Sequence, residues 1–201
     1  ITAPDDMKKK VAISFFANYT FCANQNLEEL FQKNLAETIN RECPDILLIK
    51  PGDAGCPDFL IRPLLLQSRH LDNLALAKAG QRLGLNAIIT GAFIDIIAHK
   101  EKQGLLWFKD DTNFLRVLIS CEVYDIETGA KLLDESFDYE VRIDELEFAS
   151  IKTKKVKETA ALKNALMHIA EVMGEKICNT IVVLPWKGYV VSTTNNRIII
   201  S

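Results

Sequence analysis

Short apolar runs and helix-period patterns alternate along the first part of the chain. An apolar run over 10–16 predicts a strand buried on both faces, and apolar residues at helical spacing over 27–39 predict an amphipathic helix with Asn26 as its N-cap. Residues 45–50 repeat the buried-strand pattern, and a second helical pattern covers 71–83. This order of strand, helix, strand and helix predicts that the first strands of the sheet are parallel.

The second part of the chain predicts antiparallel strands and one more helix. After a third apolar run over 87–98, alternating apolar residues over 114–124 and 133–141 flank the turn sequence 125–129, which is typical of a β-hairpin. A helical pattern over 162–173 follows. We therefore predict an α/β (α+β) fold with a mixed sheet of about five strands in the element order β-α-β-α-β-β-β-α.

The end of the chain predicts a change of architecture. Residues 181–184 suit one more short strand before Pro185, and from 187 onward two apolar runs flank a polar turn, which indicates a β-hairpin. A hairpin this short is marginally stable alone. We therefore divide the chain into an α/β domain over 1–186 and, over 187–201, the opening hairpin of a longer C-terminal β module.

Composition and charge narrow the classes of function. Of the 201 residues, 48% are hydrophobic and 25% are charged, which is typical of a globular protein. The formal net charge of -3 offers no basic surface for a phosphate backbone, so we do not expect nucleic acid as a partner. The longest apolar stretch, 87–98, contains Gly91 and Asp95 and is too short for a transmembrane segment. The chain starts at Ile1 without a targeting segment, so we expect a mature or trimmed form.

Two short motifs carry a resemblance to a known group of proteins. The segment 84–91 is Gly-Leu-Asn-Ala-Ile-Ile-Thr-Gly, and 124–129 is Tyr-Asp-Ile-Glu-Thr-Gly. Together with the element order, these motifs resemble the amino-terminal domain of TolB. They are similar also to the curli-secretion lipoprotein CsgG, the penicillin-binding-protein activator LpoB and the middle domain of the flagellar assembly protein FlgT. The tail over 186–200 resembles the entry to the C-terminal β module of the FlgT type.

The resemblance implies a non-catalytic protein of the bacterial cell envelope. Members of these families are usually exported or lipidated, act in the periplasm or at the outer membrane, and hold other proteins. The chain would then scaffold or dock a secretion, flagellar or cell-wall assembly, with an envelope protein or a second copy as partner and with neither a cofactor nor a small ligand. The alternative is an enzyme or small-ligand-binding α/β domain that uses the loops 18–25 and 52–58, at the carboxyl ends of parallel strands.

Chemical motifs do not favour a catalytic or metal site. The loop 51–57 follows a strand but lacks the Gly-Lys-Ser/Thr ending of a phosphate loop. His70, His99 and His168 are not spaced i, i+4 from one another, so we expect ordinary surface or boundary histidines. The sequence contains no Gly-x-Ser-x-Gly nucleophile motif. We therefore assign no catalytic, cofactor or metal-binding residue.

Four polar residues alternate along the last predicted strand of the sheet: Asp134, Ser136, Asp138 and Glu140. Alternate residues of a strand share a face, so the four lie on one side of the sheet. A divalent cation could bind such a row. A solvated face that discourages edge pairing is the more common explanation, and we favour it.

An apolar cluster interrupts the connection between the third and fourth strands: Leu105, Leu106, Trp107 and Phe108. Four consecutive bulky residues cannot all face one core, so part of the cluster is expected to be exposed. Exposed aromatic clusters are typical of partner contacts. Burial against this domain or against the missing module is the other explanation.

The five cysteines predict two disulfides in an oxidising compartment. Parallel first strands bring the loops with Cys22 and Cys56 to one end of the sheet. The first and third helices end near Cys43 and Cys178, at the other end. We therefore predict the pairs Cys22–Cys56 and Cys43–Cys178 in the periplasm, and a buried free thiol at Cys121, which lies on an apolar strand face.

Overall fold

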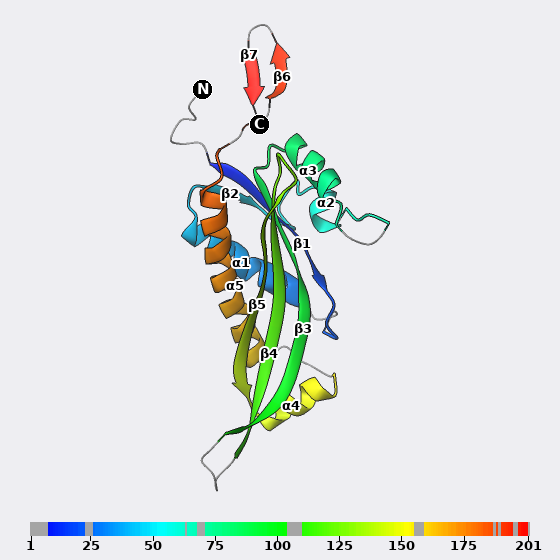
Figure 1. Cartoon of the computed structure of the whole chain (residues 1–201), viewed down its shortest axis with the longest axis vertical. Coiled ribbons are helices and arrows are strands. Elements are labelled where there is room, and N and C mark those ends of the chain that lie inside the picture. Colours follow the sequence, from blue (N-terminus) through cyan, green and yellow to red (C-terminus); the bar gives the residue numbers. More distant parts are fainter. Residues whose placement is uncertain are drawn as a thin grey trace.

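A mixed five-stranded sheet with the strand order β2-β1-β3-β4-β5 lies at the centre of the chain (Figure 1). The computed structural model describes residues 8–22, 26–62, 64–67, 71–103, 110–154, 159–186, 188, 190–194 and 197–200. The strands of the sheet are β1 (Lys9–Asn18), β2 (Ile46–Ile49), β3 (Ala87–Gln103), β4 (Asp110–Asp125) and β5 (Lys131–Ile143). β1 pairs in parallel with β2 and β3, whereas β3, β4 and β5 pair antiparallel. The predicted α/β (α+β) class with its mixed sheet is therefore confirmed.

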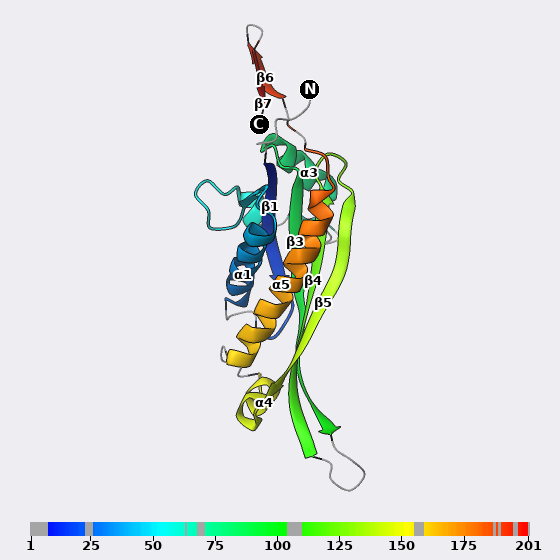
Figure 2. The ribbon, with the colours of Figure 1, turned by 90° about the vertical axis from the view of Figure 1, so that its left-hand side faces the viewer.

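Helices cover the two faces of this sheet unequally (Figures 1 and 2). The long helices α1 (Leu27–Glu42) and α5 (Ala160–Val182) lie side by side over one face and enclose the larger core. The short helices α2 (Asp58–Ile61) and α3 (Asn73–Arg82) cover the other face at one end and enclose a smaller core. At the opposite end, α4 (Glu145–Lys152) packs beside β3 and β4.

A close approach between α1 and α5 requires a glycine. A Cβ atom built on Gly174 of α5 would lie 2.5 Å from Thr38 Cγ2 of α1. Real Cβ atoms do not come this close, so a larger residue at position 174 would push the helices apart. Phe31 and Leu35 of α1 and Met173 of α5 are fully buried in the core around this crossing.

The strand β3 extends beyond the end of its neighbour β1. The parallel ladder between them ends at the pair Asn18 and Phe93, whereas β3 continues to Gln103 and pairs with β4 along its whole length. A break in register between Phe93 and Asp95 marks this point on the β4 side as well. The far part of the sheet therefore consists of β3, β4 and β5 alone among the described strands.

The predicted hairpin turn is held by an aspartate and a glycine. The Asp125 carboxylate accepts hydrogen bonds from Thr128 N and Thr128 Oγ1, and Gly129 has a φ of 70°. The left-handed region suits glycine, and an Asp side chain commonly closes a turn of this kind. The Tyr-Asp-Ile-Glu-Thr-Gly motif is therefore explained by the hairpin connection alone.

Three local predictions need correction. Residues 181 and 182 belong to α5, because Ile177, Cys178 and Ile181 continue its buried stripe, so no strand forms there. Asn26 stands at the N-cap of α1, but its backbone is left-handed and its side chain makes no capping hydrogen bond. The short helices α2 and α4 were not predicted, because they are too short for a periodic pattern.

The C-terminal hairpin consists of β6 (Val190–Thr194) and β7 (Arg197–Ile200), which pair antiparallel in a separate two-stranded sheet. Figure 1 shows this hairpin beyond the end of the sheet that α3 covers. The division at 186 and 187 and the missing remainder of a β module stay predictions. Within the described residues, no helix combines the length and the apolar character that crossing a membrane requires.

Candidate functional site on the uncovered sheet face

The sheet has one face that α2 and α3 cover only at one end. On β3, β4 and β5, every second side chain enters the core under α1 and α5, among them Ile96, Val117 and Tyr139. Their neighbours in sequence point the other way, because side chains alternate along a strand. We call this surface the uncovered face, and its members are Ile94, Ile97, His99, Glu101, Phe114, Arg116, Leu118, Ser120, Glu122, Asp134, Ser136, Asp138, Glu140 and Arg142.

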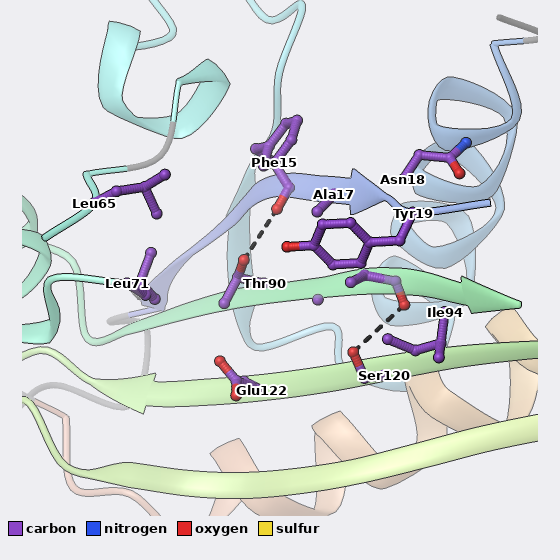
Figure 3. Close-up of a pocket in the computed structure, with 12 residues that line it drawn as sticks. Phe15, Ala17, Asn18, Tyr19, Leu65, Leu71, Thr90, Ile94, Ser120 and Glu122 are labelled. Atoms are coloured by element: carbon purple, nitrogen blue, oxygen red, sulfur yellow. Dashed lines mark hydrogen bonds between the residues drawn. The ribbon is translucent and has the colours of Figure 1, made fainter. Parts of the chain in front are cut away.

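A groove of about 530 Å³ opens on this face where β1 leaves β3 (Figure 3). Phe15, Ala17 and Tyr19 line it from β1 and the residue just beyond β1, and Ile94 lines it from β3. Leu65 and Leu71 close its other side and form an isolated antiparallel bridge with each other. Tyr19, Leu65 and Ile94 are 75%, 51% and 40% exposed, so the groove presents large apolar side chains to solvent.

The polar groups of the groove are engaged in local hydrogen bonds. Thr90 Oγ1 donates to Phe15 O at 3.0 Å, and Ser120 Oγ donates to Ala92 O at 3.4 Å (Figure 3). The Glu122 carboxylate accepts hydrogen bonds from Tyr124 Oη at 2.7 Å and from Lys131 Nζ at 2.6 Å. These hydrogen bonds hold the two hydroxyls and the carboxylate in place within the sheet. The groove therefore suits apolar contact rather than nucleophilic chemistry.

The ion pair between Glu122 and Lys131 lies at the end of the groove, and the pKa values of Tyr124 and Lys131 beside Glu122 are both raised. Burial, together with the hydrogen bond to the Glu122 carboxylate, raises the pKa of Tyr124. Burial opposes the charge of Lys131, but its hydrogen bonds to Glu122 and Asp134 outweigh that effect and raise its pKa. Both groups therefore hold their protons more tightly than in the unfolded chain.

The acidic row of β5 lies on the uncovered face, and two of its carboxylates are paired with cations. Lys131 Nζ lies 2.9 Å from Asp134 Oδ2, and Arg116 Nε lies 2.9 Å from Asp138 Oδ2. Glu140 Oε2 lies 3.2 Å from His99 Nε2. Most of the row is thus a solvated strand face whose carboxylates form ion pairs. The sequence favoured a solvated face over a cation site.

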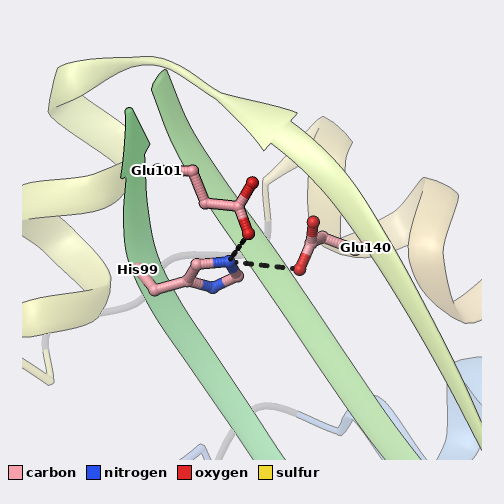
Figure 4. A group of neighbouring side chains, drawn as sticks. All are labelled: His99, Glu101 and Glu140. Atoms are coloured by element: carbon pink, nitrogen blue, oxygen red, sulfur yellow. Dashed lines mark ion pairs between the residues drawn. The ribbon is translucent and has the colours of Figure 1, made fainter. Parts of the chain in front are cut away.

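His99, Glu101 and Glu140 form a cluster that the sequence did not predict (Figure 4). Spacing along the chain could not reveal it, because Glu140 comes from a strand that does not pair with β3. The sequence did offer one signal. His99 and Glu101 are alternate residues of one strand and so share a face, and Glu140 belongs to another strand of the same sheet.

A second cleft occupies the position of the alternative ligand site. It has a volume of about 560 Å³, and Lys33 of α1 and Gly52 beyond β2 are among its lining residues, together with Glu29 and Lys50. Lys50 Nζ is held 3.3 Å from Asp53 Oδ1. The loop 52–58 therefore contributes to a cleft beside the start of α1, whereas Asn18 and Tyr19 from the other predicted loop line the groove instead.

One predicted disulfide is present and the other is not. Cys43, at the C-terminus of α1, is bonded to Cys178 in the last part of α5, with an S–S distance of 2.03 Å and a Cα–Cα distance of 5.9 Å. Cys22 and Cys56 are free thiols. The predicted Cys22–Cys56 pair is wrong because the sheet separates the two residues: Cys22 lies in the core under α1, and Cys56 packs against the core under α2 and α3.

The free thiols are not activated. Burial raises the pKa of Cys22 to about 11, and burial also raises the pKa values of Cys56 and Cys121. A thiol with a raised pKa is a poor nucleophile at neutral pH. Cys121 is fully buried on the core face of β4, where the sequence placed it.

The predicted partner-contact cluster of Leu105, Leu106, Trp107 and Phe108 lies outside the described residues, and so does His70. Its role in partner contact stays a prediction. His168 of α5, the remaining histidine, packs against Tyr139 with ring centres 4.1 Å apart. It therefore contributes to packing under α5.

Comparison with known proteins finds similarity in shape only. No protein-family model and no curated protein matches the chain. The hypothetical protein CT253 of Chlamydia trachomatis matches with a TM-score of 0.47 and 12% identity, over 86% of this chain and 99% of that chain. Lipoprotein GNA1162 of Neisseria meningitidis matches with a TM-score of 0.44 and 11% identity, over 85% of this chain and 99% of that chain.

TolB of Acinetobacter baumannii also matches, with a TM-score of 0.36 and 13% identity, over 87% of this chain and 27% of that chain. The structural neighbours thus include a bacterial lipoprotein and TolB. The finer resemblance to CsgG, LpoB and FlgT stays a prediction.

Proposed function

We propose that this chain is an exported, non-catalytic domain of the bacterial cell envelope that binds a partner protein through the groove on its uncovered face. The observation that carries this proposal is the exposure of Tyr19, Leu65 and Ile94 around one groove. Single exposed apolar residues are common on protein surfaces, but several around one groove are typical of a contact site.

The position of the groove favours an extended segment of the partner as its occupant. β1 stops pairing with β3 at Phe93, and β3 continues beyond it with Ile94 and Ile97 exposed on the uncovered face. A strand that adds to this edge would lie in line with β1. Its alternate side chains would enter the groove, while main-chain hydrogen bonds would supply affinity, as in other cases of β-strand addition.

The disulfide supports the location. Disulfides persist in oxidising compartments such as the bacterial periplasm and are rare in the cytosol. The bond between Cys43 and Cys178 closes a sequence separation of 135 residues and ties α1 to α5. An oxidised chain in cell extracts would therefore support export, and reduced Cys43 and Cys178 would contradict it.

Site-specific photo-crosslinking in cells tests the docking groove. A photoreactive residue at 65 or 94 should give a discrete crosslinked band to a partner protein. Matched positions on α5 should not, because Met167 and Val172 are 50% and 44% exposed, close to the 51% and 40% of Leu65 and Ile94, but lie away from the groove. Equal crosslinking at all four positions would contradict the proposal.

A thiol count tests the location independently. After export, alkylation under denaturing, non-reducing conditions should label Cys22, Cys56 and Cys121 but not the bonded pair. Labelling of all five cysteines in freshly lysed cells would count against an oxidising compartment.

A small ligand in the cleft between α1 and the loop after β2 is the second candidate function. The observation that favours it is the position of the cleft beside the carboxyl ends of parallel strands, with Lys33 and Lys50 in its lining. A thermal-shift screen with small anionic compounds tests it, and Lys33→Gln should abolish any shift that arises there. A shift that persists in Lys33→Gln would contradict binding in this cleft.

A further inference from the structure

Three potential metal ligands meet on the far part of the uncovered face (Figure 4). His99 Nε2 lies 3.4 Å from Glu101 Oε1 and 3.2 Å from Glu140 Oε2. The three ligand atoms all lie within 4.8 Å of one another. We propose that His99, Glu101 and Glu140 together bind a divalent transition-metal ion of the Zn²⁺ class.

The backbone brings these side chains together from separate parts of the chain. His99 and Glu101 are two residues apart on β3 and therefore point to the same face. Glu140 of β5 pairs with Arg116 of β4, two residues along β4 from Phe114, which pairs with His99. The imidazole and the Glu140 side chain thus reach toward each other across β4, and a bound ion would join β3 to β5 over the strand between them.

The spacing of the ligand atoms fits a small tetrahedral ion. Zinc takes nitrogen and oxygen ligands at about 2.0–2.2 Å, and two ligands at a tetrahedral angle are then about 3.3 Å apart. The distances of 3.4 and 3.2 Å from His99 Nε2 to the two carboxylates match this separation. The two carboxylate oxygens lie within 4.8 Å of each other, so rotation of the glutamate side chains would bring all three ligand atoms around one ion.

The chemistry of the ligands selects the class of ion. An imidazole nitrogen suits zinc and its neighbours in the first transition row, whereas calcium and magnesium prefer oxygen ligands alone. Two carboxylates balance the charge of a divalent ion. The side chains of His99, Glu101 and Glu140 are 32%, 50% and 37% exposed, so a water molecule can complete the coordination from the solvent side.

Neighbouring aromatic and charged groups surround the three ligands. The His99 ring stacks on the Phe114 ring, with centroids 5.7 Å apart and an interplanar angle of 22°. Arg116 Nε lies 2.9 Å from Asp138 Oδ2, and the Arg142 guanidinium lies over the same Phe114 ring, 5.9 Å from its centre. Lys100 pairs with Glu145 of α4, whose helix packs on the other side of β3.

A proton is the competitor of the metal ion. A protonated His99 would form ion pairs with both glutamates at the observed distances, with no metal bound. The two states differ in composition, because a metal ion needs a neutral imidazole and brings its own charge to the site. Metal binding by the purified chain distinguishes them directly.

The test uses the untagged full chain, stripped of metal with a chelator and titrated with ZnCl₂ by calorimetry. We expect one equivalent of Zn²⁺ to bind the wild-type chain. Loss of a ligand in His99→Gln or Glu140→Gln should weaken binding by about tenfold or more, since even the loss of an outer partner of a metal ligand costs roughly 10–100-fold. Binding should also raise the melting temperature of the wild-type chain and not that of these variants.

Matched controls separate this cluster from other ligands of the chain. His168→Gln removes a histidine under α5, and Glu145→Gln removes an exposed carboxylate on α4, and both should retain wild-type affinity. The absorption spectrum of the Co²⁺ form should lack a thiolate charge-transfer band, because the free cysteines Cys22, Cys56 and Cys121 are not ligands in this site. No Zn²⁺ binding, a thiolate band, or equal affinity in wild type and Glu140→Gln would overturn the proposal and leave the ion pair alone.

Discussion

The two parts of β3, before and after Phe93, show what a strand needs when one of its faces is exposed. Before Phe93, Ile88 and Ile89 point to opposite faces and both are fully buried, one in each core. After Phe93, Ile96 is buried in the larger core, but its neighbour Ile97 is 42% exposed. The same strand is thus sandwiched between two helix layers in its first part and covered on one face in its second.

The difference follows from what lies over each part. α2 and α3 cover only the first part of the sheet, and β1 ends where the second part begins. In the second part, the uncovered face carries His99, Glu101 and Glu140, which can stay in contact with water. The groove and the cluster of His99, Glu101 and Glu140 therefore lie where helix cover stops, because strand side chains there are accessible to solvent.

One substitution made in both parts should give the largest contrast. Ile89→Ala removes a fully buried side chain from the larger core and should lower the free energy of unfolding by about 2–5 kcal/mol. Ile97→Ala should change it by less than about 0.5 kcal/mol, because Ile97 lies on the surface and is 42% exposed. Chemical denaturation of the two variants measures both values. Equal losses would show that another part of the protein covers Ile97 in solution.

The disulfide between α1 and α5 should stabilise the folded chain. Cys43→Ser together with Cys178→Ser should lower the free energy of unfolding by about 2–5 kcal/mol, because the bond limits the unfolded chain over 135 residues. A reducing agent should lower the melting temperature of the wild type and leave that of the double variant unchanged. An unchanged wild-type melting temperature after full reduction would show that α1 and α5 do not depend on the bond.

The crossing of α1 and α5 should tolerate no added methyl group. Gly174→Ala would place Cβ 2.5 Å from Thr38 Cγ2 and should cost about 1–3 kcal/mol of unfolding free energy. Thr38→Ser removes that methyl group, so the double variant should recover part of the loss, and a double-mutant cycle measures the coupling. Additive effects would mean that the clash is relieved by a shift of the helices.

Titration of Lys131 and Tyr124 at the edge of the uncovered face should change the stability of the chain less than the substitutions above. The pKa values of Lys131 and Tyr124 are raised on folding, so above their ordinary values of 10.5 and 10.0 the folded chain keeps protons that the unfolded chain loses. Stability should therefore fall as pH rises beyond about 10. Tyr124→Phe should make this fall shallower in melting curves recorded from about pH 9 to about pH 11. An equal slope in wild type and variant would assign the fall to other groups.

The fold was predictable where sequence patterns are local and strong. The helix over 27–39, the strand pattern over 114–124 and the Asp125 turn all depend on near neighbours in sequence, and the structure contains each of them. The continuation of α5 through residue 182 was not predicted, because an apolar stretch at a helix end has the same composition as a buried strand. The length of β3 was also underestimated, since its last residues are polar and are held in the strand by pairing with β4.

The candidate sites were predictable only in part. The parity of β5 placed Asp134, Asp138 and Glu140 on one face, but Arg116 and His99, the partners of Asp138 and Glu140, come from β4 and β3. Lys131, the partner of Asp134, lies on β5 itself. The cysteines show the same division: helix lengths brought Cys43 near Cys178, whereas the failure of Cys22 to meet Cys56 depends on which face of the sheet each loop packs against.

The sequence by itself determined the order of the long helices and the sheet strands, the alternation of faces along β4 and β5 and the turn at Asp125, because periodicity and turn chemistry act over a few residues. The tertiary structure alone decided where β1 stops beside β3, where the helix layers end, and hence that Tyr19 and Leu65 line one groove and that His99 lies beside Glu140. The physical reason is that these contacts join residues far apart in the chain, and only the packing of the sheet against its helices sets the distances between them.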